Sequence, residues 1–434
     1  MAIFDDLSWS PAALYAHKIN PTLWQDLNDV ENFGFLSMRV FDLFFVDLAD
    51  DRYAGTQVQP FHLVTPDNET LYGWHILPLH LCREHEELLN EHMSYGPAED
   101  YTKTVAYKLL AEDPNARVVV NCKCRPPSSS HPKQPDLTDL SVHGNAAHLG
   151  SALRPEMYRM YLGISTPSNP VHIFAIDYRG FGLSTGSPTE EGVITDGLTL
   201  LNFLTSSPLN VPPSRIAIVG LSLGTAVTSA AAERFAFGAP ESAIIQPAIK
   251  DPEPFAGIIL LASFSNIPNL IESYSLKGLT PPMLSPLIGY PRAQKYFLDR
   301  IYDRWDTAAR VARLTGVGPT AKDESDAVYA NKALDLTIVH ARDDVEIPWW
   351  EGARVWKAAI GETEKGEPSE GKFVYERIAE NGLTEIRVWE KEVQPEKGAR
   401  AVKKVRWEKV GYGGHNHVGA YSVAALAVLR AFEE

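Results

Sequence analysis

The sequence contains one short segment with the residue types of an activated nucleophile. Ser222 stands at the centre of the run Gly220-Leu221-Ser222-Leu223-Gly224. The β-branched residues of Arg215–Val219 predict a buried strand before it, and the small residues after it predict a helix. A serine on a sharp strand-to-helix turn is presented above the edge of a sheet, where the flanking glycines prevent side-chain clashes. We therefore interpret Ser222 as a nucleophile.

An acidic turn later in the chain supplies candidates for the carboxylate that such a nucleophile needs. A nucleophilic serine works with a base and with an acid that orients the base, and after this type of turn the acid precedes the base in the chain. Asp343 and Asp344 directly follow the predicted strand Leu334–His340 and come before Pro348. Because aspartate is also common as a helix N-cap, the residues alone leave its role, and the choice between the two, open.

Two histidines near the C-terminus are candidates for the base. His415 and His417 follow the last predicted strand, Val402–Val410, in a segment that begins Gly411-Tyr412-Gly413-Gly414. The glycines allow this loop to approach the serine closely. We expect His415 to be the base, with His417 as the alternative.

Backbone N–H groups are the expected donors to the oxyanion that forms when a serine attacks a carbonyl. One donor is expected on Leu223, directly after the nucleophile, and the other on Asn145, in the upstream segment His143–Gly150. A His-Gly pair alone is equally typical of a polar turn. Asp177 and Arg179, which follow another predicted strand, are interpreted as structural turn residues.

Strand-like and helix-like segments alternate along the chain, which predicts an α/β fold with a mostly parallel, twisted sheet and helices on both faces. The first two predicted strands are expected to form an antiparallel hairpin. The predicted strands are Val58–Thr65, Leu71–Leu77, Ala116–Asn121, Val171–Ile176, Arg215–Val219, Gly257–Ala262, Leu334–His340, Glu385–Glu390 and Val402–Val410. The predicted helices are Glu84–His92, Ser151–Tyr161, Thr189–Thr205, Leu223–Phe235, Gln294–Leu314, Gly352–Ile360 and Val418–Phe432.

We divide the chain into an N-terminal arm, residues 1–57, and a single domain, residues 58–434. The apolar, proline-interrupted connection over about residues 263–300 is either a small cap or a crossover helix that packs on the sheet. Two further insertions are expected: an irregular one over about 124–141 and a polar, solvated excursion over about 361–401. Residues 40–55 and 124–141 are either genuine loops or insertions that arise from the gene model.

The amino-acid composition is that of a globular protein, and its charge argues against some classes of partner. The 434 residues are 44% hydrophobic and 22% charged, as in ordinary globular proteins, and the formal net charge is −15. Such a charge argues against nucleic acid as a partner. The three cysteines, Cys82, Cys122 and Cys124, have no zinc or disulfide spacing, and we expect neither a metal nor a cofactor.

Targeting patterns give a further expectation. The chain begins Met1-Ala2-Ile3-Phe4-Asp5-Asp6, unlike a signal peptide, and no stretch reaches the about 18 uninterrupted apolar residues that a membrane span needs. We therefore expect a cytoplasmic protein whose contact with membranes is at most peripheral. The sequence leaves the oligomeric state open.

Together, these motifs resemble those of α/β-hydrolase-fold serine hydrolases of the monoacylglycerol and lysophosphatidylserine lipase type, the α/β-hydrolase domain twelve family. The resemblance covers roughly residues 56–123 and 142–434. The segments that carry it are His143–Ala146, Asp177–Gly180, Gly186–Gly192, Gly220–Thr225 and His340–Asp344.

The resemblance implies a catalytic triad of Ser222, Asp344 and His415, since in this family the acid lies four residues after the histidine of an H-x-x-x-D turn, here His340. It also implies association with the endoplasmic reticulum. The sequence departs from the family in lacking the transmembrane segment of the animal members and in the insertion before the His-Gly turn.

We therefore expect a serine hydrolase that cleaves a fatty-acid ester, a monoacylglycerol or a lysophospholipid, without a cofactor. A leucine- and isoleucine-rich cap suits an acyl chain, because each buried methylene contributes about 0.8 kcal/mol. The alternatives are a serine aminopeptidase-like hydrolase and a non-catalytic binding protein of the same fold.

Overall fold

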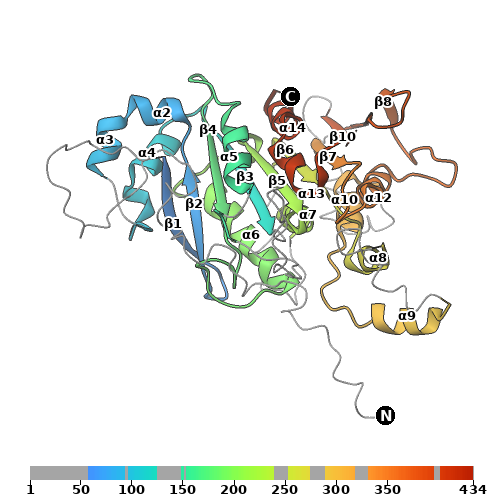
Figure 1. Cartoon of the computed structure of the whole chain (residues 1–434). Helices are drawn as coiled ribbons and strands as arrows, with labels where there is room; N and C mark the ends of the chain where they lie inside the picture. The colour runs from blue at the N-terminus through green and yellow to red at the C-terminus, as the bar shows by residue number, and fades with distance from the viewer. Residues whose placement is uncertain are drawn as a thin grey trace, which may run out of the picture.

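The computed structural model describes residues 57–92, 96–124, 148–150, 153–238, 253–273, 289–317, 331–394 and 401–433 (Figure 1). The strands are β1 (Val58–Val64), β2 (Thr70–Ile76), β3 (Arg117–Cys124), β4 (Val171–Ile176), β5 (Ile216–Ser222), β6 (Gly257–Leu261), β7 (Leu334–Ala341), β8 (Lys372–Ile378), β9 (Glu385–Val393) and β10 (Ala401–Val410). Within these ranges they form one ten-stranded sheet in the order β1-β2-β4-β3-β5-β6-β7-β10-β9-β8. The α/β architecture predicted from the sequence is confirmed.

The middle of the sheet is parallel and its margins are antiparallel. β4, β3, β5, β6, β7 and β10 run parallel to one another, whereas β1, β2, β9 and β8 are antiparallel to their neighbours. The predicted hairpin of β1 and β2 is confirmed, with Val58 opposite Ile76. Because parallel strands place their carboxyl ends at one edge, residues that follow β5, β7 and β10 lie along the same edge of the sheet.

Helices cover both faces of this sheet. The α-helices are α2 (Leu79–Glu84), α3 (Glu86–Glu91), α4 (Val105–Ala111), α5 (Arg154–Leu162), α6 (Glu190–Thr205), α7 (Leu223–Phe237), α8 (Ile267–Ser273), α9 (Pro291–Leu298), α10 (Thr307–Thr315), α12 (Trp349–Ile360), α13 (Gly414–His417) and α14 (Ser422–Glu433). α5 and α14 pack on one face, and α6, α7, α10 and α12 pack on the other.

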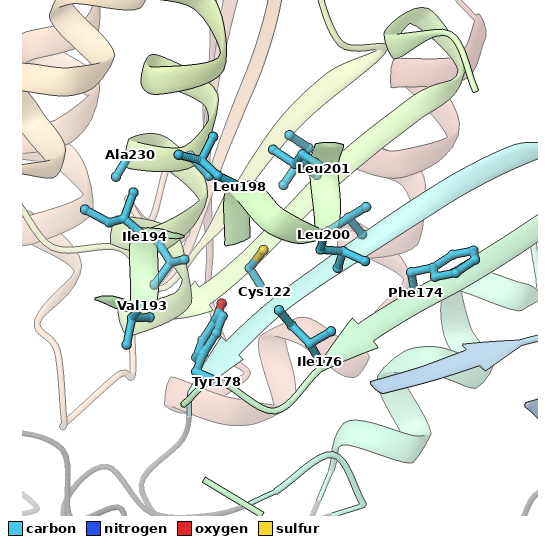
Figure 2. Close-up of a cluster of buried hydrophobic side chains, with 14 of the residues drawn as sticks. Cys122, Phe174, Ile176, Tyr178, Val193, Ile194, Leu198, Leu200, Leu201 and Ala230 are labelled. Atoms are coloured by element: carbon cyan, nitrogen blue, oxygen red, sulfur yellow. The ribbon is translucent and has the colours of Figure 1, made fainter. Parts of the chain in front are cut away.

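Side chains of the inner strands alternate between the two faces. Val118 and Val120 of β3 join a buried cluster with α6 and α7, whereas Val119 joins the cluster under α5 and α14. Figure 2 shows part of the first cluster, which includes Leu198 of α6 and Cys122 of β3. Strands that are buried on both faces have nearly continuous apolar sequences, which is why the sequence pattern predicted them.

The single helix predicted over Gln294–Leu314 is wrong, because two helices with different environments occupy this stretch. α9 has no buried residue and extends away from the sheet in Figure 1, whereas α10 buries Val311 and Leu314 against the core. Trp305 separates them: its side chain is fully buried and its φ of 50° is incompatible with a continuous α-helix.

The polar excursion expected over residues 361–401 contains more regular structure than the sequence predicted. β9 corresponds to the predicted strand Glu385–Glu390, and its Trp389 is fully buried and donates Nε1–H to the Glu370 carbonyl at 2.7 Å. β8 was not predicted. It forms the outer edge of the sheet with mostly exposed side chains, so its sequence lacks the apolar character of a buried strand.

Several expectations concern residues outside the described ranges. These are the arm up to residue 56, including 40–55, most of the 124–141 insertion, and residues 274–288 of the expected cap. Among the helices that the structure does describe, none combines the length and the apolar character needed to cross a bilayer.

A chain of buried polar side chains connects β2 and β4 far from the carboxyl edge. His75 Nδ1 lies 2.8 Å from the Tyr101 hydroxyl, and its Nε2 lies 2.9 Å from His172 Nδ1. The His75 ring also stacks on Phe174, with the ring centroids 4.2 Å apart. Burial, together with His172, lowers the pKa of His75 well below its usual range, and burial with His80 lowers the pKa of His172 to about 3.

We predict that these histidines make the fold sensitive to acid. The unfolded chain takes up their protons below about pH 6.5, whereas the folded chain keeps them neutral, so stability that is complete above this pH is lost as pH falls towards 4. The double variant His75→Phe/Tyr101→Phe removes one neutral histidine together with the hydroxyl that it contacts. The phenylalanine ring introduced at position 75 can keep the stacking on Phe174. The free energy of unfolding from urea titrations should then depend less steeply on pH between 6.5 and 4.5, by about 1.4 kcal/mol per pH unit.

The matched control is His92→Gln, at an exposed histidine, which should leave the pH dependence unchanged. A double variant with the same pH dependence as the wild type would contradict the prediction.

Candidate active site

Ser222 occupies a strained turn between β5 and α7. Its φ of 57° and ψ of −126° lie outside the regions that non-glycine residues normally adopt, and α7 begins at the next residue. A Cβ atom on Gly220 would lie 2.3 Å from the Gly224 carbonyl oxygen, so the close approach of strand and helix requires glycine there. Thr225 Oγ1 donates a 2.6 Å hydrogen bond to the Ser222 carbonyl. The sharp strand-to-helix turn expected at Ser222 is therefore present as a backbone geometry.

The two predicted partners of Ser222 follow β7 and β10, at the same edge of the sheet. β7 and β10 are paired to their last residues, with Ala341 opposite Val410. The Arg342 N–H then donates to the Val410 carbonyl at 2.7 Å, which keeps the two chains together beyond the strands. Asp344 lies in the turn after β7, and His415 lies in α13 after β10.

Asp344 and His415 are brought together by a direct hydrogen bond. His415 Nδ1 lies 2.8 Å from Asp344 Oδ2, and both residues are buried. His340 Nε2 also approaches Oδ2, at 3.2 Å. The other oxygen, Oδ1, accepts from the backbone N–H groups of Glu346 and Ile347, each at 2.9 Å.

These contacts keep the Asp344 carboxylate ionised. Burial opposes its ionisation, but the nearby His415 and the hydrogen bonds from His340 and His415 outweigh burial and hold the pKa of this carboxyl well below its usual range. The Asp344 carboxylate therefore carries a full negative charge next to the His415 imidazole at neutral pH.

Asp343, the other candidate acid, contacts the backbone of the loop that carries His415. Its Oδ1 accepts from the Gly414 N–H at 2.7 Å and its Oδ2 from the Gly413 N–H at 3.4 Å. Gly413 and Gly414 both have positive φ, 139° and 51°. Asp343 thus holds this glycine turn in place, a role that the sequence analysis missed because two adjacent acids in a turn look alike.

His417, the alternative base, lies two residues after His415 at the end of α13. Its ring packs against Tyr421, with centroids 6.3 Å apart, and the side chain is half-buried. His415 is thus the histidine that the structure places on the acid.

Of the two predicted oxyanion donors, the structure describes Leu223 but not Asn145. Leu223 is the first residue of α7, where N–H groups have no partner within the helix and carry partial positive charge. Asn145 lies outside the described residues. The last part of its segment is described: the Gly150 N–H donates to His148 Nδ1 at 3.2 Å, and burial with the nearby Arg154 lowers the pKa of His148 to about 4.

The acidic and basic residues after β4 are both buried. Arg179 pairs with Asp67 at 2.5 Å and with Asp196 at 2.8 Å, as expected of a structural residue. Asp177 lies 3.9 Å from the Arg154 guanidinium, and burial raises the pKa of this carboxyl to about 7 against the opposing effect of Arg154.

The start of the expected cap is tied to the helix after the acidic turn. Glu351 of α12 is fully buried and accepts from the Ser265 N–H at 3.1 Å and the Ser265 hydroxyl at 2.7 Å. Within this connection, α9 projects outward with exposed Tyr290 and Tyr296, and residues 274–288 lie outside the described ranges, so the cap and the crossover helix both stay predictions.

Among the residues that the structure describes, no group of three or more His, Cys, Asp or Glu side chains is placed to hold a metal ion.

Known proteins share this sequence and architecture in part. Lysophosphatidylserine lipase ABHD12 of Danio rerio is 25% identical over 318 residues, which are 73% of this chain and 63% of that protein. Protein ABHD12B of Homo sapiens is 34% identical over 140 residues, 30% of this chain and 35% of that protein. The chain thus spans less than two thirds of the length of these curated relatives.

A solved α/β hydrolase from Vibrio vulnificus is 13% identical, with a TM-score of 0.45, over 87% of this chain and 81% of that one. The model of the alpha/beta hydrolase family matches residues 140–381, more than half of the chain and the part that contains Ser222 and Asp344. The chain therefore belongs to the α/β-hydrolase family and resembles its ABHD12 members.

Proposed function

We propose that the protein is a serine hydrolase that cleaves a lipid ester, with Ser222 as nucleophile, His415 as general base and Asp344 as the acid that orients it. The observation that carries the proposal is the 2.8 Å hydrogen bond between His415 and Asp344 at the sheet edge where the strained Ser222 lies. The order of the three residues in the chain is also that of α/β hydrolases.

In the proposed reaction, each of these groups has one role. Ser222 Oγ attacks the acyl carbon and gives its proton to His415 Nε2, while Asp344 holds the Nδ1–H and stabilises the imidazolium. The Leu223 N–H at the start of α7 donates to the oxyanion, with Asn145 as the proposed second donor. His415 then protonates the leaving alcohol, and water releases the fatty acid from the acyl-enzyme.

The substrate class rests on the relatives and on the charge of the chain. The Danio rerio relative is named a lysophosphatidylserine lipase, which favours a lipid ester as substrate. The net charge of −15 favours a neutral monoacylglycerol over an anionic lysophospholipid. Arg292 and Lys295 of the exposed α9 would offset this repulsion if they line the entrance to the site, although Lys295 is paired with Asp299 at 2.7 Å. Lys277, the third such residue, lies outside the described ranges.

The proposed triad predicts how strongly each substitution should lower labelling and turnover. Ser222→Ala should abolish labelling by a fluorophosphonate and lower kcat on p-nitrophenyl esters by about 10⁴-fold or more, because only the oxyanion donors and binding remain. Asp344→Asn should lower kcat by about 10⁴-fold, since it favours the wrong tautomer of His415. His417→Ala is the matched control for His415→Ala and should keep both labelling and turnover. Loss of activity in the His417 variant alone would move the base to that residue.

Because Asp343 contacts only the backbone of the His415 loop, we expect its substitution to lower activity less than substitution of Asp344. Asp343→Ala removes the acceptor of the Gly413 and Gly414 N–H groups and should lower kcat/KM by about 10-fold, because the loop then holds His415 less firmly. Asp343→Asn keeps an acceptor oxygen and should stay within about 3-fold of the wild type. Rates are to be divided by the number of sites that the fluorophosphonate labels. Equal damage from Asp343→Asn and Asp344→Asn would overturn this division of roles.

Binding of a long acyl chain predicts a dependence on ester length. If each added methylene is buried, kcat/KM should rise a few-fold per methylene from short to medium acyl chains. At equal chain length, a monoacylglycerol should be hydrolysed faster than lysophosphatidylserine at low salt, and added salt should reduce the difference. Arg292→Glu/Lys295→Glu should widen the difference at low salt. A preference for acetyl esters or amino-acid amides would exclude a lipase and favour an aminopeptidase-like hydrolase.

A further inference from the structure

A second histidine shares the Asp344 carboxylate with His415. His340 belongs to β7, is fully buried, and places its Nε2 3.2 Å from Asp344 Oδ2 and 2.9 Å from the Ile347 carbonyl oxygen. Both neighbours are acceptors, so the Nε2 atom carries the proton and donates to them. His340 Nε2 thus links the Asp344 carboxylate to the backbone of the turn at Ile347.

The opposite side of the ring fits this tautomer. His340 Nδ1 is buried and has no hydrogen-bond partner in the described part of the chain. A Cβ atom on Gly352 would lie 2.4 Å from Nδ1, so the backbone of α12 closes off this side of the ring. Packing between β7 and α12 leaves the His340 ring little room to turn away from Asp344.

We propose, on the basis of the function proposed above, that His340 is a positioning residue that fixes the Asp344 carboxylate and moderates the basicity of His415. Oδ2 accepts from both imidazoles, so its negative charge is divided between two N–H donors. Without the His340 donor, Oδ2 would interact more strongly with a protonated His415 and favour the imidazolium. The carboxylate would also lose one of the contacts that hold its orientation.

Other charged groups near His415 stay constant when His340 is changed. Glu346 Oε2 lies 3.9 Å from His415 Nε2, and Asp343 holds the N–H groups at the start of α13. His417 lies on the same short helix. A change in the titration of His415 between variants of His340 therefore reports the shared hydrogen bond.

The experiment compares His340→Leu with His340→Gln in the full chain. Leu removes the donor, whereas the Gln side-chain amide can place an N–H near the position of Nε2. His340→Leu should lower kcat/KM per fluorophosphonate-labelled site by about 10-fold or more and move the acid limb of its pH profile up by about one pH unit. His340→Gln should restore the limb to within about 0.3 pH unit and the rate to within about 3-fold.

A general loss of stability is separated by a matched control on the same strand. Ile338→Ala opens a cavity under β7 and should lower the melting temperature, but it should leave the acid limb in place. If His340→Leu lowers the melting temperature while its rate per labelled site and its acid limb match the wild type, His340 is only a structural residue and the proposal is wrong.

A readout without substrate distinguishes this proposal from the proposed function. The proton between His415 Nδ1 and Asp344 should give a downfield ¹H NMR signal whose pH titration follows His415. Its midpoint should move to higher pH in His340→Leu and return in His340→Gln. A wild type that never reacts with esters or fluorophosphonates would refute the hydrolase, whereas an unmoved NMR midpoint in the Leu variant would refute the role of His340.

Discussion

A carboxylate can stay charged away from water only if hydrogen-bond donors replace the water that it has lost, and Asp344 is where this protein meets that constraint. Its donors come from three parts of the chain: His340 on β7, two backbone N–H groups of the following turn, and His415 after β10. They converge only because β7 and β10 are neighbours whose carboxyl ends are level. The parallel order of the sheet is thus a condition for the charge on Asp344, and the charge is a condition for orienting His415.

A steric constraint acts at the same edge of the sheet. The backbone of Ser222 is strained, which costs on the order of 1–3 kcal/mol and persists only where the surroundings enforce it. β5 is held between β3 and β6, and α7 is buried along nearly its whole length, so neither side of the turn can relax. Glycine at position 220 permits the resulting approach of α7 to the strand. Packing across several layers therefore supports the position of one hydroxyl group.

The elements that the sequence pattern predicted are those whose environment is uniform along the segment. The inner strands are buried on both faces, and their apolar runs identify them without knowledge of their neighbours. β8 escaped prediction because only one of its edges is paired and its side chains face solvent. The boundary between α9 and α10 depends on the burial of Trp305, which is a tertiary contact.

The candidate site divides in the same way. Ser222 and His415 follow from glycine spacing and chain order, which are local. Asp343 and Asp344 are adjacent and of one type, so their difference arises only from the contacts of each carboxylate: Asp344 with His415, and Asp343 with the Gly413–Gly414 backbone. Family resemblance favoured Asp344, but spacing alone could not, because both lie in the same turn.

Asp177 shows that position at this edge does not by itself produce an ionised acid. It follows β4 as Asp344 follows β7, and both are buried, yet burial raises the pKa of Asp177 to about 7 while that of Asp344 is held well below its usual range. At Asp177, the Arg154 guanidinium at 3.9 Å and the backbone of Leu149 and Leu183 oppose burial without outweighing it, whereas Asp344 receives four hydrogen bonds at 2.8 to 3.2 Å. The interaction with His415, together with the close hydrogen-bond donors, outweighs burial at Asp344 and makes it the carboxylate that is fully charged at neutral pH. The strand pairing that aligns those donors therefore places the negative charge beside His415.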